Sequence, residues 1–334
     1  MTIEKIRISL GSASLLGLNK IKVEKCPTTC YLMTYRRDSC NANCAFCPQS
    51  RSSKNKGNQN KLSRVSWPVY PLQDIINAFG KDKIQRKFNR ICIQTLKYPE
   101  NYKDLMEIVN RIRNFSNIPI SCAIPPVSKR KLKKLKNLGV NRIGISLDGA
   151  TLKVFNNIKG KEVNGPYTWE SHFKCLKNAI NVFSSSYVST HLIFGLGETH
   201  KEFLKITQEL HNRNITSSLF PFIPIPNTKL EQRQRPKIVN FRKIQLARYL
   251  IINDTKNYRD FIYNSNEEII DFDISTKKLR ELTNIGTPFL TSGCSHCNRP
   301  FYTSRPSGPT YNFPNSLSKR EKDKIFKKKK KVQN

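Results

Sequence analysis

Three cysteines in a C-x3-C-x2-C arrangement restrict this chain more than any other feature of its sequence. Cys40, Cys44 and Cys47 lie in the segment CNANCAFCPQS, and Phe46 stands just before the last of them. Three thiolates on one short loop can bind three irons of a cubane cluster, which leaves the fourth iron open to a chelating cofactor. A zinc knuckle is the alternative, but structural zinc sites use four ligands, commonly as C-x2-C pairs. The spacing therefore favours an iron–sulfur site.

Strand and helix patterns alternate with short connections after the cysteines. Strands are expected at 89–96, 118–124, 140–148, 187–197 and 217–225, and helices at 71–80, 101–115, 129–139, 168–183, 199–213 and 241–251. This rhythm predicts a parallel sheet with crossover helices. We expect about six such units, and therefore an α/β fold built as a partial (βα)6 barrel of the TIM type, or a complete one.

A second motif, HLIFGLGETHKE, occupies 191–202 at the end of an expected strand. Together with the cysteines it resembles the radical S-adenosylmethionine (SAM) superfamily, over about residues 30–250. Ile193, Gly195 and Glu198 match that family's G-x-I-x-G-x-x-E element, whereas His191 replaces its first glycine. Glycines let the backbone approach a cofactor closely. The alternative is an ordinary strand–turn–helix junction in which Glu198 is favoured by the dipole of the next helix.

The resemblance implies that SAM chelates the open iron through its amino and carboxylate groups. One-electron cleavage then yields a 5′-deoxyadenosyl radical, which abstracts hydrogen while the protein directs the chemistry. In such proteins a polar pair like Ser146 and Asp148 holds the SAM ribose, although Asp148 as a cap of the following helix is an alternative. The cofactor-binding candidates are Phe46, Gln94, Thr95, Ser146, Asp148, Ile193, Gly195 and Glu198.

Two further cysteine pairs lie outside the expected barrel. Cys26 and Cys30 precede the triad, and Cys294 and Cys297 follow the last βα unit. Together they supply four thiolates, which would suit either zinc or an auxiliary [4Fe–4S] cluster. We favour the cluster, which gives the chain two [4Fe–4S] clusters in all.

Three other positions bear on the type of enzyme. Biotin synthases hold a second cluster inside the barrel with three cysteines and an arginine. Cys92 and Cys122 fall where two of those cysteines would lie, but Ser189 occupies the third position. We therefore interpret Cys92 and Cys122 as small core residues on strands.

The segment TSGCSHCNRPFYTSRPSGPTYNFP near the C-terminus resembles the two-component lipoyl synthases of archaea and some bacteria. The resemblance implies that the chain is one of the two components. It would insert sulfur at carbon six or eight of an octanoyl chain on a carrier protein, with the auxiliary cluster as sulfur donor. Ser292 or Ser304 could replace a thiolate ligand of that cluster.

The partners implied are an octanoylated acidic carrier protein (a lipoyl domain or glycine-cleavage H protein), a second related subunit, and an electron donor such as ferredoxin or flavodoxin. The chain contains 59 Lys and Arg against 24 Asp and Glu, a net charge of +35, which favours anionic partners. Biased composition explains the charge equally well. Nucleic acid is a less favoured partner.

Three alternative functions stay open at this point. The first is biotin synthase, acting on dethiobiotin. The second is a radical SAM enzyme that modifies tRNA, which the basic charge supports, although no recognisable RNA-binding domain is appended. The third is a non-catalytic zinc or nucleic-acid binding protein, which leaves the GLGET strand unexplained.

The expected organisation has four parts. An N-terminal extension covers 1–39, the barrel core 40–255, a C-terminal extension 256–314, and a basic disordered tail 315–334. No run of about 18 apolar residues occurs, so no membrane span is expected. The N-terminus lacks the features of a signal peptide. The expected location is the cytoplasm.

Overall fold

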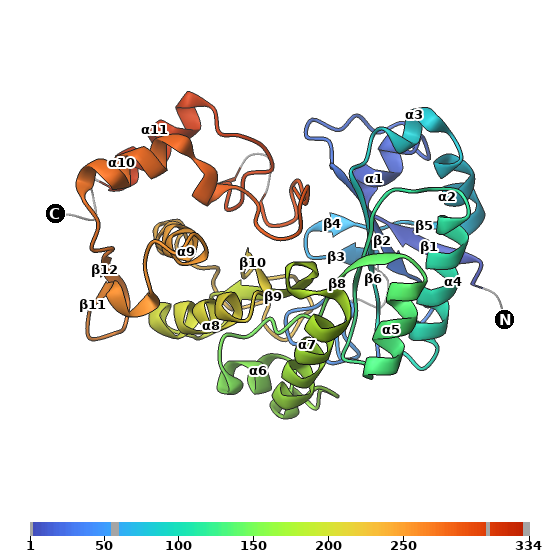
Figure 1. Ribbon diagram of the computed structural model, residues 1–334, viewed down its shortest axis with the longest axis horizontal. Coiled ribbons are helices and arrows are strands. Elements are labelled where there is room, and N and C mark those ends of the chain that lie inside the picture. Colours follow the sequence, from blue (N-terminus) through green and yellow to red (C-terminus); the bar gives the residue numbers. More distant parts are fainter. Residues whose placement is uncertain (1–2, 55–59, 305–307, 330–334) are drawn as a thin grey trace.

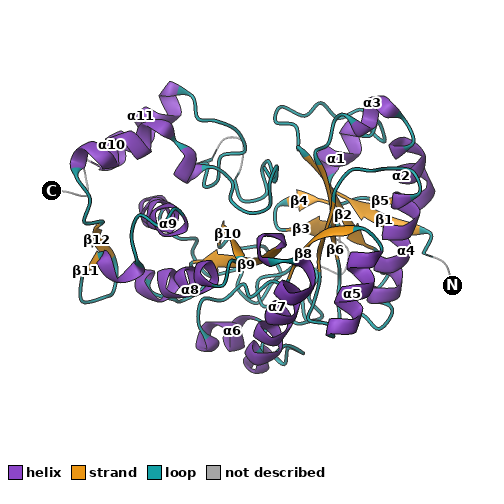
Figure 2. Cartoon of the chain, viewed as in Figure 1, coloured by secondary structure: helices purple, strands orange, loops and turns teal. Residues whose placement is uncertain are grey.

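The structure is a computed structural model that describes residues 3–54, 60–304 and 308–329. Within these residues, eight strands form one sheet in the order β10-β9-β8-β7-β6-β2-β1-β5 (Figures 1 and 2). Six neighbouring strands run parallel: β2 (Thr29–Thr34), β6 (Arg90–Gln94), β7 (Ile120–Ala123), β8 (Val140–Gly144), β9 (Val188–Phe194) and β10 (Thr216–Pro221). This confirms the predicted α/β fold with a partial (βα)6 barrel.

The other strands are short. At one edge β1 (Lys5–Ile8) pairs antiparallel with β2 and with β5 (Val69–Pro71). Two small hairpins are formed by β3 (Lys61–Leu62) with β4 (Val65–Ser66), and by β11 (Ile262–Tyr263) with β12 (Ile269–Asp271). The strand β2 lies before residue 40, so the first strand of the barrel belongs to the segment that the sequence assigned to an N-terminal extension.

Helices connect the parallel strands and cover one face of the sheet. They are α1 (Leu10–Leu15), α2 (Leu72–Phe79), α3 (Asp82–Gln85), α4 (Asn101–Arg113), α5 (Lys129–Asn137), α6 (Leu152–Ile158), α7 (Trp169–Phe183), α8 (His200–Asn212) and α9 (Ile238–Ile252). Four single 3-10 turns occur at Lys161–Val163, Ser185–Tyr187, Tyr258–Asp260 and Thr287–Phe289. In Figure 1, α2, α4 and α5 lie on one side of the molecule, and α8 and α9 lie towards the other.

Side chains of a strand point alternately to the two faces of a sheet, and this alternation sorts the strand residues here. Cys30, Ile91, Ile93 and Cys122 belong to the large apolar core that the helices share with the sheet. Tyr31, Met33 and Cys92 belong to a second cluster on the opposite face. We call this opposite face the inner face.

The C-terminal part of the chain returns to the inner face. Its anchor is Gln245 on α9, whose amide donates to Tyr311 O (3.1 Å) and Asn312 Oδ1 (2.9 Å). The Ser292 hydroxyl then accepts from the backbone N–H of Leu219 on β10 at 2.8 Å. Residues 291–304 thereby lie against the strands of the barrel.

The tail differs from its expected disorder. After α10 (Thr276–Ile285), the helix α11 (Lys319–Lys329) begins behind Ser318, whose hydroxyl and N–H both donate to Glu321 at 2.7 Å. Leu317 and Ile325 pack in a small apolar cluster with Phe289 and Phe313. The apolar contacts of Leu317 and Ile325 thus hold in place a helix that the lysine-rich sequence did not predict. Residues 330–334 of the predicted tail lie outside the described residues.

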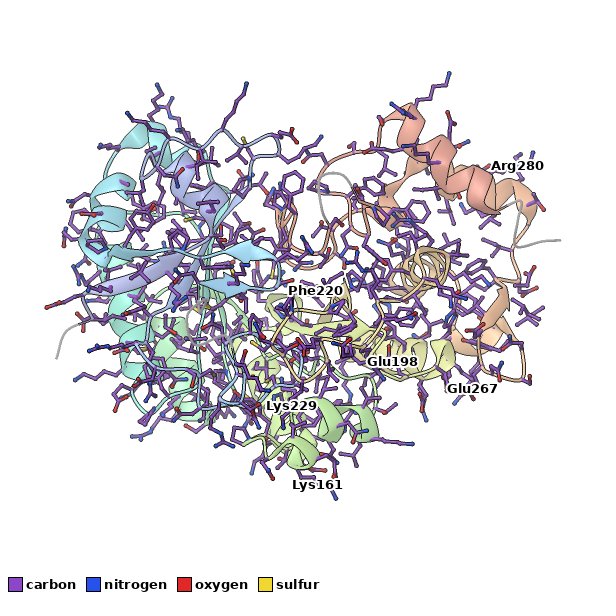
Figure 3. The ribbon with its side chains drawn as sticks, turned by 180° about the vertical axis from the view of Figure 1, so that it is seen from behind. Lys161, Glu198, Phe220, Lys229, Glu267 and Arg280 are labelled. Atoms are coloured by element: carbon purple, nitrogen blue, oxygen red, sulfur yellow. The ribbon has the colours of Figure 1, made fainter. Side chains whose placement is uncertain are left out.

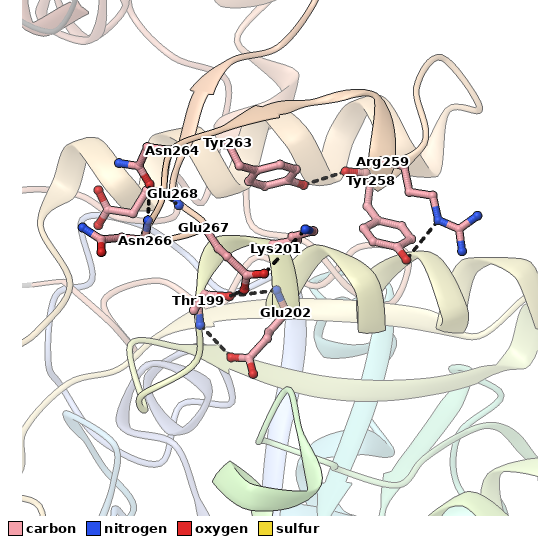
Figure 4. Close-up of polar contacts among 10 residues, drawn as sticks. All are labelled: Thr199, Lys201, Glu202, Tyr258, Arg259, Tyr263, Asn264, Asn266, Glu267 and Glu268. Atoms are coloured by element: carbon pink, nitrogen blue, oxygen red, sulfur yellow. Dashed lines mark hydrogen bonds and ion pairs between the residues drawn. The ribbon is translucent and has the colours of Figure 1, made fainter.

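A polar network fixes the start of α8, directly after the glycine motif (Figure 4). Thr199 and Glu202 form a reciprocal capping box, with N–H to side-chain distances of 2.9 and 3.1 Å. The Thr199 hydroxyl also donates to Glu267 at 2.8 Å, and Lys201 lies 3.5 Å from the same carboxylate. The hairpin that carries Glu267 therefore supports the loop 195–198 from outside.

Candidate active site

The cysteine triad lies on the loop that follows β2, at the carboxyl end of the parallel strands. The Cys40 N–H donates to Gln49 O at 3.0 Å, and the Cys40 thiol accepts from the N–H of Lys97 at 3.1 Å. Lys97 comes shortly after β6, so one bond within the loop and one from the end of the neighbouring strand fix the first cysteine. Active sites of (βα) barrels are built at this end of the strands.

The far side of the triad loop is tied to two other segments. The Ala45 N–H donates to Ile158 O at 2.7 Å, and Ala45 O accepts from Leu230 N–H at 3.2 Å. The Asn43 amide donates to Val163 O and accepts from the N–H of Ser52 at 3.1 Å. Contacts with these two segments therefore help to hold the triad loop in place.

The three thiols interact with one another. Burial raises the pKa of Cys44 to about 12, against the pull of the Lys159 ammonium. Burial also raises the pKa of Cys47, and the Cys44 and Cys40 thiols add to that shift. Neighbouring buried thiols stay neutral unless a metal deprotonates them. The donor set thus fits three irons of a cluster, with a fourth iron left for a cofactor.

A site for a single metal ion requires all its ligands to converge on one point. The described residues contain no group of three or more His, Cys, Asp or Glu side chains that could hold one metal ion. Each thiolate of an iron–sulfur cluster binds a separate iron, so its cysteines need not converge on one point.

Phe46 and Ile193 lie together beside the triad. Both pack against the same small cluster, which contains Val154, Leu196 and Phe222. The motif strand β9 and the triad loop therefore share an apolar surface at the carboxyl end of the sheet. A flat apolar ring such as adenine suits this kind of surface.

Ser146 and Asp148 follow β8. The Ser146 hydroxyl lies 2.9 Å from His191 Nδ1 on β9. Asp148 has a left-handed backbone with φ of 63°, and its carboxylate forms a 2.7 Å ion pair with Lys159. Asp148 does not cap α6, because Thr151 performs that role by accepting from Val154 N–H at 3.1 Å. The capping alternative for Asp148 is therefore wrong.

Glu198 holds the loop between β9 and α8. Its two carboxylate oxygens accept from the backbone N–H groups of Gly195 (2.6 Å) and Leu196 (3.1 Å). Burial raises the pKa of Glu198 to about 7, and the Gly195 N–H opposes that shift. Glu198 precedes the helix, and the acidic residue of the first turn is Glu202. Figure 3 shows Glu198 and Phe220 towards the middle of the molecule.

Gln94 and Thr95 end β6. Gln94 is partly exposed and pairs in register with Met33, which places it on the inner face. The Thr95 hydroxyl donates to Ala123 O at 3.2 Å, so it is occupied within the sheet. Gln94 is thus the better placed of the two for a cofactor contact. Beside them, Asn41, Lys97, Tyr98 and Pro125 help to line a cavity of about 440 Å³.

Sequence reasoning missed three residues near the triad. The Lys159 ammonium lies 5.0 Å from the centre of the Tyr167 ring, and the His172 ring packs edge-on against Tyr167 at 5.3 Å between centroids. Burial raises the pKa of Tyr167, and so does the Cys44 thiol beside it. Lys159 and Tyr167 come from a helix end and a loop without any motif, so only the fold reveals them.

The structure brings the segments of the two outer cysteine pairs together, because the Asn298 amide donates to Cys26 O at 2.9 Å and accepts from the Thr28 N–H at 3.1 Å. It does not bring all four thiols to one face of the sheet. The Cys30 thiol lies in the core on the helix side of the sheet, and Cys26 is exposed. Cys297, in contrast, lies 3.5 Å from the hydroxyl of Tyr31 on the inner face. The reason is strand alternation, because neighbouring residues on β2 point to opposite faces. The four-thiolate site expected from the sequence is therefore not formed.

The fold and the triad loop together define a radical SAM protein. Residues 37–210 match the model of the Radical SAM superfamily, and the chain belongs to that superfamily. Membership implies a [4Fe–4S] cluster and SAM as cofactors. No helix in the described part of the chain combines the length and apolar character that a membrane crossing needs.

Among curated proteins, the chain is similar to biotin synthases. That of Sulfurihydrogenibium sp. (strain YO3AOP1) is 26% identical over 234 residues, which cover 69% of this chain and 65% of the relative. That of Persephonella marina is 26% identical over 206 residues, with 60% and 56% covered. The match thus spans less than two thirds of either relative.

A solved structure supports the fold. The FeFe-hydrogenase maturase HydG from Carboxydothermus hydrogenoformans superposes with a TM-score of 0.53 at 16% identity, covering 87% of this chain and 73% of that one.

Proposed function

We propose that this chain inserts sulfur into unactivated C–H bonds of a small organic substrate, in the manner of a biotin synthase acting on dethiobiotin. The observation that carries the proposal is the triad loop, fixed by backbone bonds at the carboxyl end of the sheet in a chain similar to biotin synthases. The lipoyl synthase reading favoured by the C-terminal segment becomes the second candidate.

The bound cofactor would supply a 5′-deoxyadenosyl radical for hydrogen abstraction. The chain's own residues would hold that cofactor. Cys40, Cys44 and Cys47 fit the irons, and the Lys159 ammonium fits an anionic group such as the SAM carboxylate. Lys159 contacts Oδ2 of Asp148, so the other carboxylate oxygen would accept from a ribose hydroxyl.

The inner face would hold the substrate. Between the triad and the deeper strand residues lie Gln94, Ala123, Ser146, His191 and Phe220, each partly exposed. Burial lowers the pKa of His191 to about 4, so its ring is neutral near pH 7 and can accept or donate one hydrogen bond. A mixed polar and aromatic lining suits a small substrate with both apolar carbons and polar groups.

An octanoyl group on a carrier protein is the second candidate substrate. The observations that favour it are Ser189 at the third cysteine position of biotin synthases and the C-terminal pair Cys294 and Cys297. A net charge of +35 would speed encounter with an acidic carrier domain, and salt would slow it.

The test is turnover. Reconstituted, reduced protein is incubated with SAM and either dethiobiotin, an octanoylated carrier domain with and without candidate partner subunits, or total tRNA. Mass spectrometry then detects sulfur added to each. The proposal expects sulfur in dethiobiotin, and the Cys44→Ala variant should give none. Sulfur only in the octanoyl chain would establish the second candidate, and sulfur only in tRNA would overturn both.

A further inference from the structure

We propose that Cys92, Cys294 and Cys297 hold a second iron–sulfur cluster on the inner face of the sheet, inside a cage of buried arginines. This ligand set differs from the one expected from the sequence, which paired the C-terminal cysteines with Cys26 and Cys30. A role for this cluster as sulfur source rests on the proposed function, whereas its presence does not.

The three thiols come from two distant parts of the chain but face the same space. Cys92 on β6 pairs in register with Tyr31 on β2, and the Tyr31 hydroxyl lies 3.5 Å from the Cys297 thiol. Cys92 and Cys297 also pack in one apolar cluster on the inner face. The Cys294 thiol lies 3.9 Å from the Ser189 hydroxyl on β9. All three cysteines are partly buried.

The electrostatics of the thiols agree with this grouping. Burial raises the pKa of Cys92 to about 12, and the Cys297 and Cys294 thiols add to the shift. Burial also raises the pKa of Cys294, with Cys297 adding to it and Arg142 opposing it. These interactions place the three thiols near one another, and three neighbouring thiols, as in the triad, are a donor set suited to iron.

The backbone conformation of the C-terminal loop positions Cys294 and Cys297 beside the strands. Gly293 has φ of 135°, and a Cβ there would lie 2.5 Å from Ser218 Oγ, so only glycine fits against β10. Cys297 N–H then donates to Cys294 O at 3.0 Å, which closes a tight C-x2-C turn. The N–H of Arg299 donates to the Tyr31 hydroxyl at 3.0 Å and fixes the turn on β2.

Arginines surround this group of thiols. Arg90, Arg142 and Arg248 are 6%, 7% and 9% exposed, and the Nε–H of each lacks a hydrogen-bond partner. Arg90 and Arg142 act on the Cys294 thiol, and Arg299 acts on Cys92. Among the described residues, no carboxylate forms an ion pair with any of the four.

Each of the four guanidinium groups donates to a neutral acceptor: Asn141, Thr216, Ser217 O or Ser292 O. Buried guanidinium groups without an anionic partner are costly, so this arrangement favours an anion beside them. A cluster with three thiolate ligands carries negative charge and would supply it. Ser189, whose hydroxyl lies 3.9 Å from the Cys294 thiol, and Arg299, which acts on Cys92, are the candidates for the position left without a thiolate. Cys92 lies within β6, whereas the triad follows the carboxyl end of β2, so the cluster would lie deeper in the barrel than the triad.

Iron binding in the absence of the triad tests this site directly. The full chain with Cys40→Ala, Cys44→Ala and Cys47→Ala is reconstituted anaerobically, and its iron, acid-labile sulfide and zinc are measured with the EPR spectrum of the reduced protein. We expect iron and sulfide in equal amounts, no more than about four of each per chain. Adding Cys92→Ala or Cys294→Ala should abolish both, together with the EPR signal.

Cys30→Ala and Cys122→Ala are the matched controls, because both thiols are buried on the helix side of the same sheet. They should leave the iron unchanged, as should Cys26→Ala. Cys92→Ser, which keeps the side-chain size, guards against a folding defect and is accepted only with an unchanged melting temperature. Three outcomes would overturn the proposal: iron retained by folded Cys92 and Cys294 variants, iron lost with Cys26→Ala, or zinc in place of iron. If the iron behaves as expected while no substrate gains sulfur, only the proposed function fails.

Discussion

The Lys159 ammonium lies 2.7 Å from the Asp148 carboxylate, and both side chains are almost completely buried, at 5% and 11% exposure. Lys159 also donates to Ser146 O at 2.7 Å. One cation thus joins the end of α6 to the end of β8 directly beside the triad, and both partners carry groups that a charged cofactor can use.

Lys159→Met should destabilise the protein by about 3–5 kcal/mol, because it leaves the Asp148 carboxylate buried without a partner. The double variant with Asp148→Asn should recover much of this loss. Urea unfolding of wild type, the single variant and the double variant measures it. A single-variant loss below about 0.5 kcal/mol, the range of ordinary surface substitutions, would mean that the pair has no role in stability.

Stability should fall in mild acid because of His200. Burial lowers the pKa of His200 from 6.5 to about 4, and its Nδ1 accepts from the N–H of Ile269 at 3.2 Å. The unfolded chain therefore binds more protons than the folded one between these values, so the contribution is complete above pH 6.5 and is lost as the pH falls towards 4. The full effect is about 3 kcal/mol.

Comparing wild type with His200→Gln by urea unfolding at several pH values isolates this contribution. Glutamine can still accept from Ile269 but does not titrate, so the variant should lose less stability than wild type on acidification. Parallel curves for the two proteins would show that His200 is not held neutral.

Gly195→Ala should cost more than Gly17→Ala. Both glycines have positive φ, 106° and 78°, so alanine strains the backbone at either position. A Cβ at residue 195 also lies 2.9 Å from Pro236 Cδ, whereas one at residue 17 meets nothing within 4 Å. We expect a loss of about 1–2 kcal/mol for Gly17→Ala and clearly more for Gly195→Ala, measured by urea unfolding. Equal losses would contradict the close packing of the motif loop.

Local pattern predicted most of the barrel. Each expected strand from 89–96 to 217–225 overlaps an observed one, because β-branched runs between helical periodicities define them. The triad loop could also be predicted from the sequence, because its chemistry depends on the spacing of cysteines within one short segment. The antiparallel edge strands β1 and β5 were not predicted, because their pairing depends on contacts between segments distant in sequence.

The roles of the remaining cysteines could not be read from spacing. Cys92 and Cys122 look alike in sequence, but strand alternation and register place one on the inner face and the other in the core. The sequence grouped the pair Cys26 and Cys30 with Cys294 and Cys297 because together they supply four thiolates, yet the Cys30 thiol faces the helices. No sequence motif marks Lys159 or Tyr167. Their position beside the triad is evident only from the fold, in which the end of α6 contacts the triad loop.

Reductive cleavage of SAM by wild type and by Cys44→Ala tests the central claim most directly. Both proteins are reconstituted anaerobically with iron and sulfide, reduced, and incubated with SAM, and 5′-deoxyadenosine is measured by mass spectrometry. Wild type should form it, and Cys44→Ala should form none, because the triad loop then lacks one of three thiolates. Cys175→Ala, which removes a buried thiol on α7, should behave as wild type. Formation of 5′-deoxyadenosine by Cys44→Ala at the wild-type rate would contradict the assignment of the triad as the SAM-binding cluster site.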